Sequence, residues 1–167
     1  MHDELTPQDI KKMQDELDER RLKLMPELLE EVKRTRAFGD LSENYEYKAA
    51  KQALNRNKGR VRYLEGMIKT ARVITDRSGV DTVGLFDKVG VYMVEDEEEQ
   101  VIQLVTTVRT DPRKGFISKE SPFGKAVLGK KVGDRVKIVV SEDYSYTCEI
   151  RSIEKGEDDG SAPLLQY

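Results

Sequence analysis

The sequence predicts an α+β chain in which a long antiparallel coiled-coil hairpin precedes a small domain with one antiparallel sheet. In the first 70 or so residues, apolar side chains recur at alternating spacings of three and four, which is typical of a helical seam. Beyond about residue 85 they alternate as in strands. Hydrophobic and charged residues each make up 37% of the 167 residues. The core must therefore be modest, which favours a hairpin plus a small domain over one large globule.

The first helix is predicted to begin at Thr6-Pro7, because a hydroxyl N-cap followed by proline is a helix start signal. Pro26 interrupts this helix and is expected to kink it. Gly39 ends the pattern, since glycine readily takes the left-handed conformation that stops a helix. The apolar seam of this helix consists of Ile10, Met13, Leu17, Leu24, Leu28 and Val32.

The second helix has a more regular seam with one polar member, Asn57, of the kind that fixes the register of a helix pair. Its members are Tyr47, Ala50, Leu54, Asn57, Val61, Leu64, Ile68 and Ala71. In an antiparallel hairpin the residue numbers of facing positions add to a constant. Pairing the two seams gives sums of 81 from Ile10–Ala71 to Leu24–Asn57 and 82 for Leu28–Leu54 and Val32–Ala50. The chain is therefore predicted to fold back at Asp40-Leu41.

Charge is unevenly distributed between the two helices. Residues 45–72 contain eight basic and two acidic residues, a net charge of +6, whereas the whole chain has a net charge of −3. Such a basic face could lie along a phosphate backbone, or it could be a solvated face near an acidic partner. The overall charge itself predicts no general attraction to nucleic acid.

Several classes of site and location are excluded by composition. The lone cysteine, Cys148, alternates with apolar strand residues and is interpreted as a sheet residue in a reducing compartment. The lone histidine, His2, is near the terminus, so a Ser-His-Asp or Cys-His catalytic site is not supported. The polar N-terminus and the lack of a long apolar run predict a cytoplasmic protein without a signal peptide or membrane span.

The second half is predicted to hold a linker at 77–84, a sheet domain at 85–155 and an acidic, disordered tail at 156–167, after a hairpin domain at 1–76. Ser121-Pro122 is expected to start the one short helix of the sheet domain, which ends at Gly129.

The predicted tip, residues 39–44, carries the carboxylates of Asp40 and Glu43. One interpretation is structural: Asp40 as N-cap and Glu43 three residues later form a capping box. The other is functional, because one or two carboxylates with water and substrate phosphates suit Mg²⁺, and a two-metal site can activate water against a phosphodiester. Spacing alone favours the capping interpretation.

Two motifs resemble the bacterial GreA/GreB transcript cleavage factors. The first is the run from Gly39 to Lys51, GDLSENYEYKAAK, and the second combines Ile117-Ser118, the run from Ser121 to Lys130, SPFGKAVLGK, and Val132-Gly133-Asp134. The resemblance extends over residues 8 to 155 in the same order and is closer to GreA. It implies an FKBP-like second domain that docks on the rim of the RNA polymerase secondary channel, with the hairpin entering the channel.

By this resemblance, Asp40 and Glu43 would share Mg²⁺ with the polymerase active centre and position water, so that polymerase cleaves its own backtracked RNA 3′ end. The factor alone would bind no cofactor, would not be an enzyme, and would act as a monomer without a membrane. Arg36 and Lys51 match basic positions that contact RNA. Ser121, Pro122 and Phe123 match the docking segment, and they also suit helix initiation and core packing.

The sequence departs from the usual family pattern at several positions. Tyr45 stands where a small residue is usual, Lys58 rather than an acid precedes Gly59, and residues 105–108 lack a common glycine. The bulk of Tyr45 leaves room for a second hypothesis, a channel-binding regulator that inhibits polymerase without cleavage. A third hypothesis is a structural coiled-coil adaptor unrelated to polymerase, against which the second motif argues.

Overall fold

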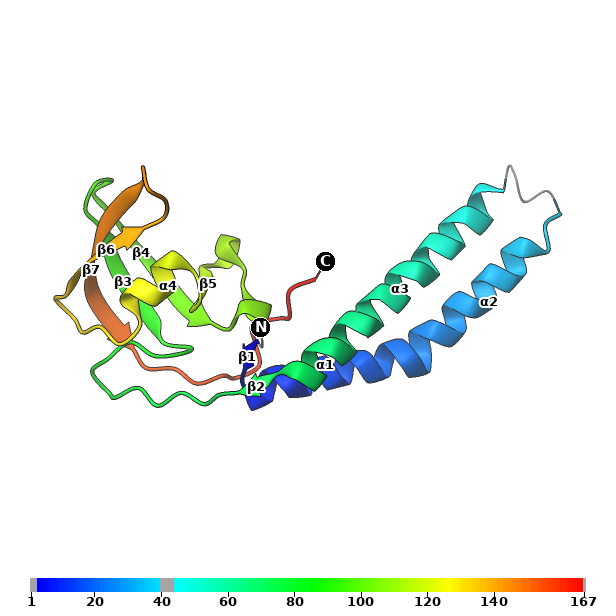
Figure 1. Cartoon of the computed structure of the whole chain (residues 1–167), viewed down its shortest axis with the longest axis horizontal. Coiled ribbons are helices and arrows are strands. Elements are labelled where there is room, and N and C mark those ends of the chain that lie inside the picture. Colours follow the sequence, from blue (N-terminus) through cyan, green and yellow to red (C-terminus); the bar gives the residue numbers. More distant parts are fainter. Residues whose placement is uncertain (1–2, 40–43, 167) are drawn as a thin grey trace. The chain divides into compact units, whose positions relative to one another are not determined.

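The computed structural model describes residues 3–39 and 44–166, which form two compact units (Figure 1). Unit 1 contains Ile10–Ala71, and unit 2 combines Glu4–Asp9 with Arg72–Gln166. The division differs from the expected hairpin domain at 1–76, because a short N-terminal strand, β1 (Glu4–Leu5), pairs in parallel with β2 (Arg72–Val73). The chain on both sides of the hairpin therefore belongs to unit 2.

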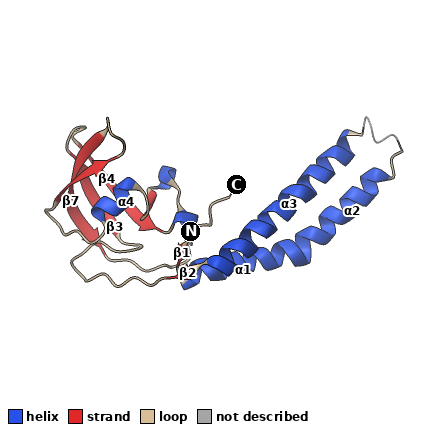
Figure 2. Cartoon of the chain, in the orientation of Figure 1, coloured by secondary structure: helices blue, strands red, loops and turns tan. Residues whose placement is uncertain are grey.

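Unit 1 is a helical hairpin, as predicted (Figure 2). Its first arm runs through α1 (Pro7–Glu19), a π-helical turn (Arg20–Leu24) and α2 (Met25–Arg36), and its second arm is α3 (Tyr45–Thr70). The two arms end and begin on either side of the predicted fold-back at Asp40-Leu41. Seam side chains from both arms are buried: Met13, Leu17, Ala50, Leu54, Asn57, Val61 and Leu64.

The interruption predicted at Pro26 takes the form of the π-helical turn just before it. Pro26 has no N–H to donate to the carbonyl four residues earlier, and its ring would crowd that carbonyl. The chain instead widens, and the N–H of Met25 donates to the carbonyl of Arg20, five residues earlier. The helix thus continues through the proline rather than ending there.

A buried polar layer crosses the middle of the hairpin. The amide oxygen of Asn57 accepts a hydrogen bond of 3.0 Å from Arg20, and its nitrogen donates to the main-chain carbonyl of Arg20. Glu16 accepts hydrogen bonds of 2.9 and 3.1 Å from Arg60 and one of 2.8 Å from Arg20. These hydrogen bonds can form in only one alignment of the two arms. The layer therefore fixes the register of the helix pair, the role that the sequence predicted for Asn57.

Unit 2 contains a five-stranded sheet in the order β5-β4-β3-β7-β6. Its strands are β3 (Lys88–Met93), β4 (Glu98–Val105), β5 (Phe116–Ser118), β6 (Arg135–Val139) and β7 (Ser145–Glu154). The sequence predicted a wholly antiparallel sheet. The observed sheet is mixed, because β5 runs parallel to β4. Two 3₁₀ turns, Thr107–Arg109 and Pro112–Lys114, lie in the connection that returns the chain to the start of β5.

The core of unit 2 lies between the sheet and α4 (Pro122–Val127), the short helix predicted from Ser121-Pro122. Cys148 is fully buried in this core, and burial raises the pKa of its thiol to about 11. The thiol is therefore protonated at neutral pH, as its interpretation as a sheet residue requires. The core residues are Val83, Val89, Val91, Ile102, Leu104, Val127, Val136, Ile138, Cys148 and Ile150.

The C-terminal segment, expected to be a disordered tail, packs on unit 2 as far as Gln166. Ala162 and Leu164 are buried, and the N–H of Leu165 donates to the carbonyl of Val108 at 2.6 Å. The sequence predicted disorder here because the segment is rich in acidic and small residues and contains few apolar residues that could pack on the domain. Among the described helices, none is both long and apolar enough to span a membrane.

Candidate functional site

The two acids singled out by the sequence, Asp40 and Glu43, lie outside the described residues. Their setting is defined by the helix ends on either side, Arg36 and Tyr45. The capping box predicted for these acids is wrong: α3 starts at Tyr45 and its N-cap is Asn44, so Glu43 does not occupy the third position of that helix. The N-cap of α3 is Asn44, a residue that the sequence analysis did not single out.

Asn44 joins the two arms beside the connection. Its side-chain oxygen accepts a hydrogen bond of 2.9 Å from the N–H of Tyr47, the usual geometry of an N-cap. Its side-chain nitrogen donates to the main-chain carbonyl of Thr35 at 2.7 Å. One amide thus satisfies an orphan donor of α3 and an acceptor near the end of α2.

The end of α2 is held by Thr35 and Gly39. The hydroxyl of Thr35, which is fully buried, donates to the carbonyls of Glu31 and Val32, at 2.9 and 3.2 Å. Gly39 has a φ of 93°, the left-handed conformation that the sequence predicted there. The chain therefore leaves α2 and enters α3 through defined caps.

Basic side chains surround these caps. Arg36 and Lys51, the predicted RNA contacts, are exposed, as is Lys48. None of these three forms a salt bridge with another described residue. Arg34 differs, because it pairs with Glu31 at 2.6 Å and, across the hairpin, with Glu46 at 3.7 Å. Hydrogen bonding by Glu31 raises the pKa of Arg34 and holds its guanidinium in place.

Each of three aromatic rings in this region has a cation over it. The Lys51 ammonium lies 5.4 Å from the centre of the Tyr47 ring, and Tyr47 itself is a half-buried seam residue, as one interpretation of the sequence expected. The Lys48 ammonium lies 5.6 Å from the Tyr45 ring. The Arg34 guanidinium lies 5.3 Å from the Phe38 ring. These distances are within the range of cation–π attraction.

The predicted docking segment starts α4 in unit 2. The hydroxyl of Ser121 accepts from the N–H of Gly124 at 3.0 Å and donates to the carbonyl of Ser118 at 2.7 Å. Pro122 is exposed, whereas Phe123 is half-buried against the core. A Cβ on Gly124 would overlap the carbonyl oxygen of Ser118 and lie 2.8 Å from the Cα of Lys119. The segment is thus packed too closely to accept a side chain there.

A buried charge cluster in unit 2 was not predicted from the sequence. The Arg109 guanidinium is inaccessible to solvent and pairs with Asp9 at 2.9 Å and Asp158 at 2.7 and 2.8 Å. It also donates to the carbonyl of Ala162. Burial alone lowers the pKa of Arg109, but hydrogen bonds to Asp158 and Asp9 outweigh burial and raise it. Arg109 and Asp9 are 100 positions apart, so no local pattern connects them.

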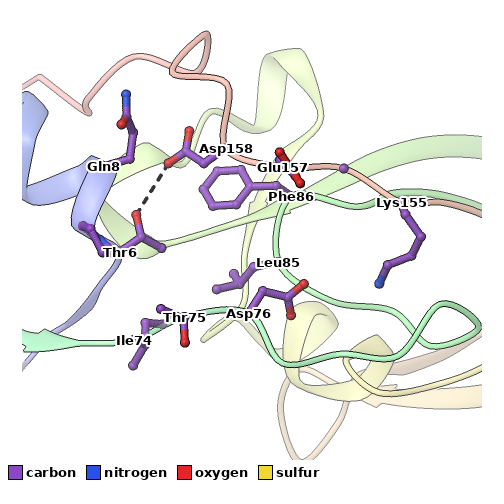
Figure 3. Close-up of a pocket in the computed structure, with 12 residues that line it drawn as sticks. Thr6, Gln8, Ile74, Thr75, Asp76, Leu85, Phe86, Lys155, Glu157 and Asp158 are labelled. Atoms are coloured by element: carbon purple, nitrogen blue, oxygen red, sulfur yellow. Dashed lines mark hydrogen bonds between the residues drawn. The ribbon is translucent and has the colours of Figure 1, made fainter.

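Beside this cluster lies a cavity of about 750 Å³, drawn in Figure 3. Thr6 and Asp158 meet at its wall through a hydrogen bond of 3.5 Å, beside the ring of Phe86. Lys155 bonds to Asp87 and to Ser78 at 2.8 Å. Because these polar groups already bond to other groups of the protein, their presence in the cavity wall does not require a bound ligand. Its lining consists of Thr6, Pro7, Gln8, Ile74, Thr75, Asp76, Leu85, Phe86, Lys155, Gly156, Glu157 and Asp158.

Metal-ligating side chains are scattered over the described residues, 3–39 and 44–166. In those ranges no three or more histidine, cysteine, aspartate or glutamate side chains gather in a way that could hold a metal ion. The chemistry of Asp40 and Glu43 fits Mg²⁺, which commonly takes one or two protein carboxylates and completes its shell with water and phosphate oxygens.

Both units match known protein families. Residues 4–73 match the family described as transcription elongation factor, N-terminal, and residues 77–155 match transcription elongation factor, GreA/GreB, C-term.

Relatives named transcription elongation factor GreA extend over most of the chain. The protein from Oenococcus oeni is 38% identical over 154 residues, which cover 92% of this chain and 95% of its own. The protein from Thermoanaerobacter pseudethanolicus is 42% identical over 137 residues, which cover 81% and 87%. The crystal structure of GreA factor homolog 1 (Gfh1) of Thermus thermophilus has a TM-score of 0.44 at 23% identity and covers 93% of this chain and 100% of that one.

Proposed function

Because the chain belongs to the GreA/GreB family of transcription elongation factors, we propose that it binds RNA polymerase and stimulates the polymerase to cleave its own backtracked transcript. The observation that carries this proposal is the construction of the hairpin end. Asn44 caps α3 and binds the end of α2, so the two helix ends that flank Asp40 and Glu43 in the sequence are joined to each other. We propose that these two acids act in the active centre of the partner, because the N-cap of α3 is already supplied by Asn44.

The hairpin has the dimensions of a probe. Its second arm has 26 residues, which at 1.5 Å per residue gives a length of about 39 Å. We infer that this arm and its partner enter the secondary channel of polymerase with the connection leading. A rod of this length can deliver side chains to a reaction centre that a globular surface could not reach.

In the proposed mechanism, Asp40 and Glu43 would hold a Mg²⁺ ion that is shared with the polymerase active centre. Bound there, Mg²⁺ supplies an activated water and stabilises charge on the phosphodiester oxygens. The carboxylates themselves would orient water and would contribute the negative charge that a divalent cation requires. The chain alone performs no hydrolysis, because the scissile RNA and the other catalytic groups belong to the polymerase complex.

Arg36 and Lys51 are proposed to contact phosphates of the extruded RNA 3′ end. Both side chains are exposed and free of salt bridges to described residues, so their charges are available. Lys51 is also steadied by the Tyr47 ring beneath it. Counterions released from the RNA would favour such contacts at low salt.

Ser121, Pro122 and Phe123 are proposed to form part of the surface that docks on the channel rim. The exposed ring of Pro122 offers an apolar contact, while Ser121 and Phe123 hold the segment in shape through the cap and the core. Docking through unit 2 would position one copy of the factor on one polymerase. We accordingly propose a monomeric factor that acts in the cytoplasm, where bacterial polymerase works.

The test is a cleavage assay on purified polymerase stalled on a backtracked RNA, with Mg²⁺ present. The wild-type chain is expected to speed release of a 3′ RNA fragment. Asp40→Ala is expected to abolish this stimulation with nearly unchanged binding to polymerase, whereas Glu30→Ala, which removes an exposed acid from α2, serves as the matched control. No stimulation by the wild-type chain would refute the proposal. Inhibited nucleotide addition without cleavage would instead indicate a channel-blocking regulator.

A further inference from the structure

We propose that Tyr45 and Phe38 form a stacking surface for the bases of the extruded single-stranded RNA 3′ end. This inference rests on the proposed function and adds to it a binding surface for the nucleobases. The two rings flank the connection: Phe38 follows the last turn of α2, and Tyr45 is the first residue of α3.

Both rings are exposed to solvent. Tyr45 is 80% exposed and Phe38 is 55% exposed, whereas the nearby Tyr47 is half-buried in the seam. Tyr45 and Phe38 therefore contribute little to the folding of the hairpin, and the apolar surface they present is available to a ligand.

A cation lies beside each ring. Lys48 lies 5.6 Å from the Tyr45 ring and pairs with no described carboxylate, so its ammonium can also meet a phosphate. Arg34, 5.3 Å from the Phe38 ring, is held by two hydrogen bonds to Glu31. Arg34 therefore helps to hold the Phe38 ring in place, while Lys48 adds a positive charge that is available to an RNA phosphate. Rings interleaved with cations are the usual composition of surfaces that bind single-stranded nucleic acid.

The charge of the region favours RNA over a protein partner. Residues 45–72 carry a net charge of +6, and Tyr45 lies at the end of that segment where Lys48 and Lys51 are exposed. The centre of a protein–protein interface is instead depleted in lysine and other charged residues. Stacking also accepts every base, because each base has a π face. A surface of this kind would let the factor act on transcripts of any sequence.

The experiment compares two backtracked complexes that differ only in the extruded RNA, one with ordinary bases and one with abasic riboses. Wild-type chain, Tyr45→Ala, Phe38→Ala and Tyr45→Phe are assayed for the cleavage rate and for binding to polymerase. Leu29→Ala is the control, because Leu29 is an exposed apolar residue on α2 that takes no part in the site. Circular dichroism of each variant reports whether the hairpin remains folded.

With ordinary bases, Tyr45→Ala is expected to lower the stimulated cleavage rate about fivefold or more, as loss of one stacked base predicts, while Tyr45→Phe and Leu29→Ala keep it. On abasic RNA the wild-type chain and Tyr45→Ala are expected to act alike. An equal loss by Tyr45→Ala on both RNAs would overturn the proposal, as would a loss confined to polymerase affinity, which would indicate a protein contact. If the wild-type chain stimulates neither complex, the proposed function itself fails.

Discussion

The side-chain nitrogen of Asn44 donates a 2.7 Å hydrogen bond to the main-chain carbonyl of Thr35 and so connects the first turn of α3 to the last turn of α2. The oxygen of the same side chain caps α3. The connection between the arms is therefore closed by one residue whose two functional groups serve different helices. This arrangement holds the two helix ends on either side of residues 40–43 together.

Replacing Asn44 with alanine is expected to destabilise the hairpin by about 1–2 kcal/mol, because a cap is lost and the Thr35 carbonyl loses a donor. Asn44→Asp keeps the capping oxygen but not the donor, so it should cost less. Urea unfolding followed by circular dichroism at 222 nm measures both. Asn55→Ala, at an exposed position on α3, is the control. A loss no larger for Asn44→Ala than for Asn55→Ala would contradict the role assigned to this residue.

Replacing Arg109 with methionine is expected to lower the stability of unit 2 by about 3–5 kcal/mol, because Asp9 and Asp158 lose the cation that compensates their buried charge. Denaturant unfolding followed by tyrosine fluorescence measures the change. Arg113→Met, on the exposed 3₁₀ turn, is the matched control. A chain that ends at Lys155 should also be destabilised, since it lacks Asp158 and the buried Leu164.

The stability of the hairpin is expected to fall in acid through Glu16. Burial raises the pKa of this carboxyl, but hydrogen bonds and charges of Arg60 and Arg20 outweigh burial and lower it. A pKa lower in the folded than in the unfolded chain stabilises the fold above the unfolded value of about 4.3, and this contribution disappears as pH falls through the folded value. Glu16→Gln should cost about 1–2 kcal/mol at pH 7 and little near pH 3.

Unfolding free energies of wild type, Glu16→Gln and Glu30→Gln between pH 7 and pH 3 provide the check. Glu30 is exposed on α2, so its variant should follow the wild-type curve. A gap between wild type and Glu16→Gln that stayed constant over this range would show that the ion pairs of Glu16 are not the source of the pH dependence.

Gly59→Ala is expected to stabilise the hairpin by about 0.5–1 kcal/mol. Gly59 lies inside α3, where an added Cβ would meet nothing within 4 Å, and alanine is the better helix former. Thermal unfolding measured at 222 nm should therefore shift upward. A downward shift would mean that this position needs glycine for a reason other than space.

Gly124→Ala is expected to weaken polymerase binding, because the new Cβ would overlap the Ser118 carbonyl and push α4 away from its cap at Ser121. Binding of labelled protein to purified polymerase measures the effect. Pro122→Ala should also weaken binding but leave the unfolding free energy nearly unchanged, since Pro122 is exposed. Unchanged binding in both variants would remove this segment from the docking surface.

The hairpin could be predicted because the apolar spacing that specifies it is local and recurs along each helix. Two seams with independent spacings place the fold-back between the observed ends of α2 and α3, at Arg36 and Tyr45. The cap was missed because Asp40 with Glu43 offers a stronger-looking pattern than a lone Asn44. An asparagine three positions before Tyr47, the first residue of the second seam, was the available signal.

The features that escaped prediction depend on contacts between distant residues. The parallel pairing of β5 with β4 depends on a connection with two 3₁₀ turns, which has no periodic signature. The Arg109 cluster joins the first turn of α1 to the C-terminal segment. The acidic composition of that segment suggested disorder, but Asp158 is a partner for a buried cation. The site acids themselves, Asp40 and Glu43, remain assigned by sequence resemblance.

The π-helical turn at Arg20–Leu24 accommodates one extra residue in the first arm of the hairpin relative to α3. Facing seam positions add to 81 on its proximal side and to 82 for Leu28–Leu54 and Val32–Ala50 on its distal side. An extra residue in an unbroken α-helix would rotate every later side chain by about 100° around the axis. The wide turn absorbs that residue, so the rotational phase of α2 against α3 is preserved up to Thr35 and Asn44. Deleting one residue from the turn should leave the packing of the seam intact. Deleting one residue from α2 should instead rotate the basic and aromatic side chains beside the connection about the helix axis.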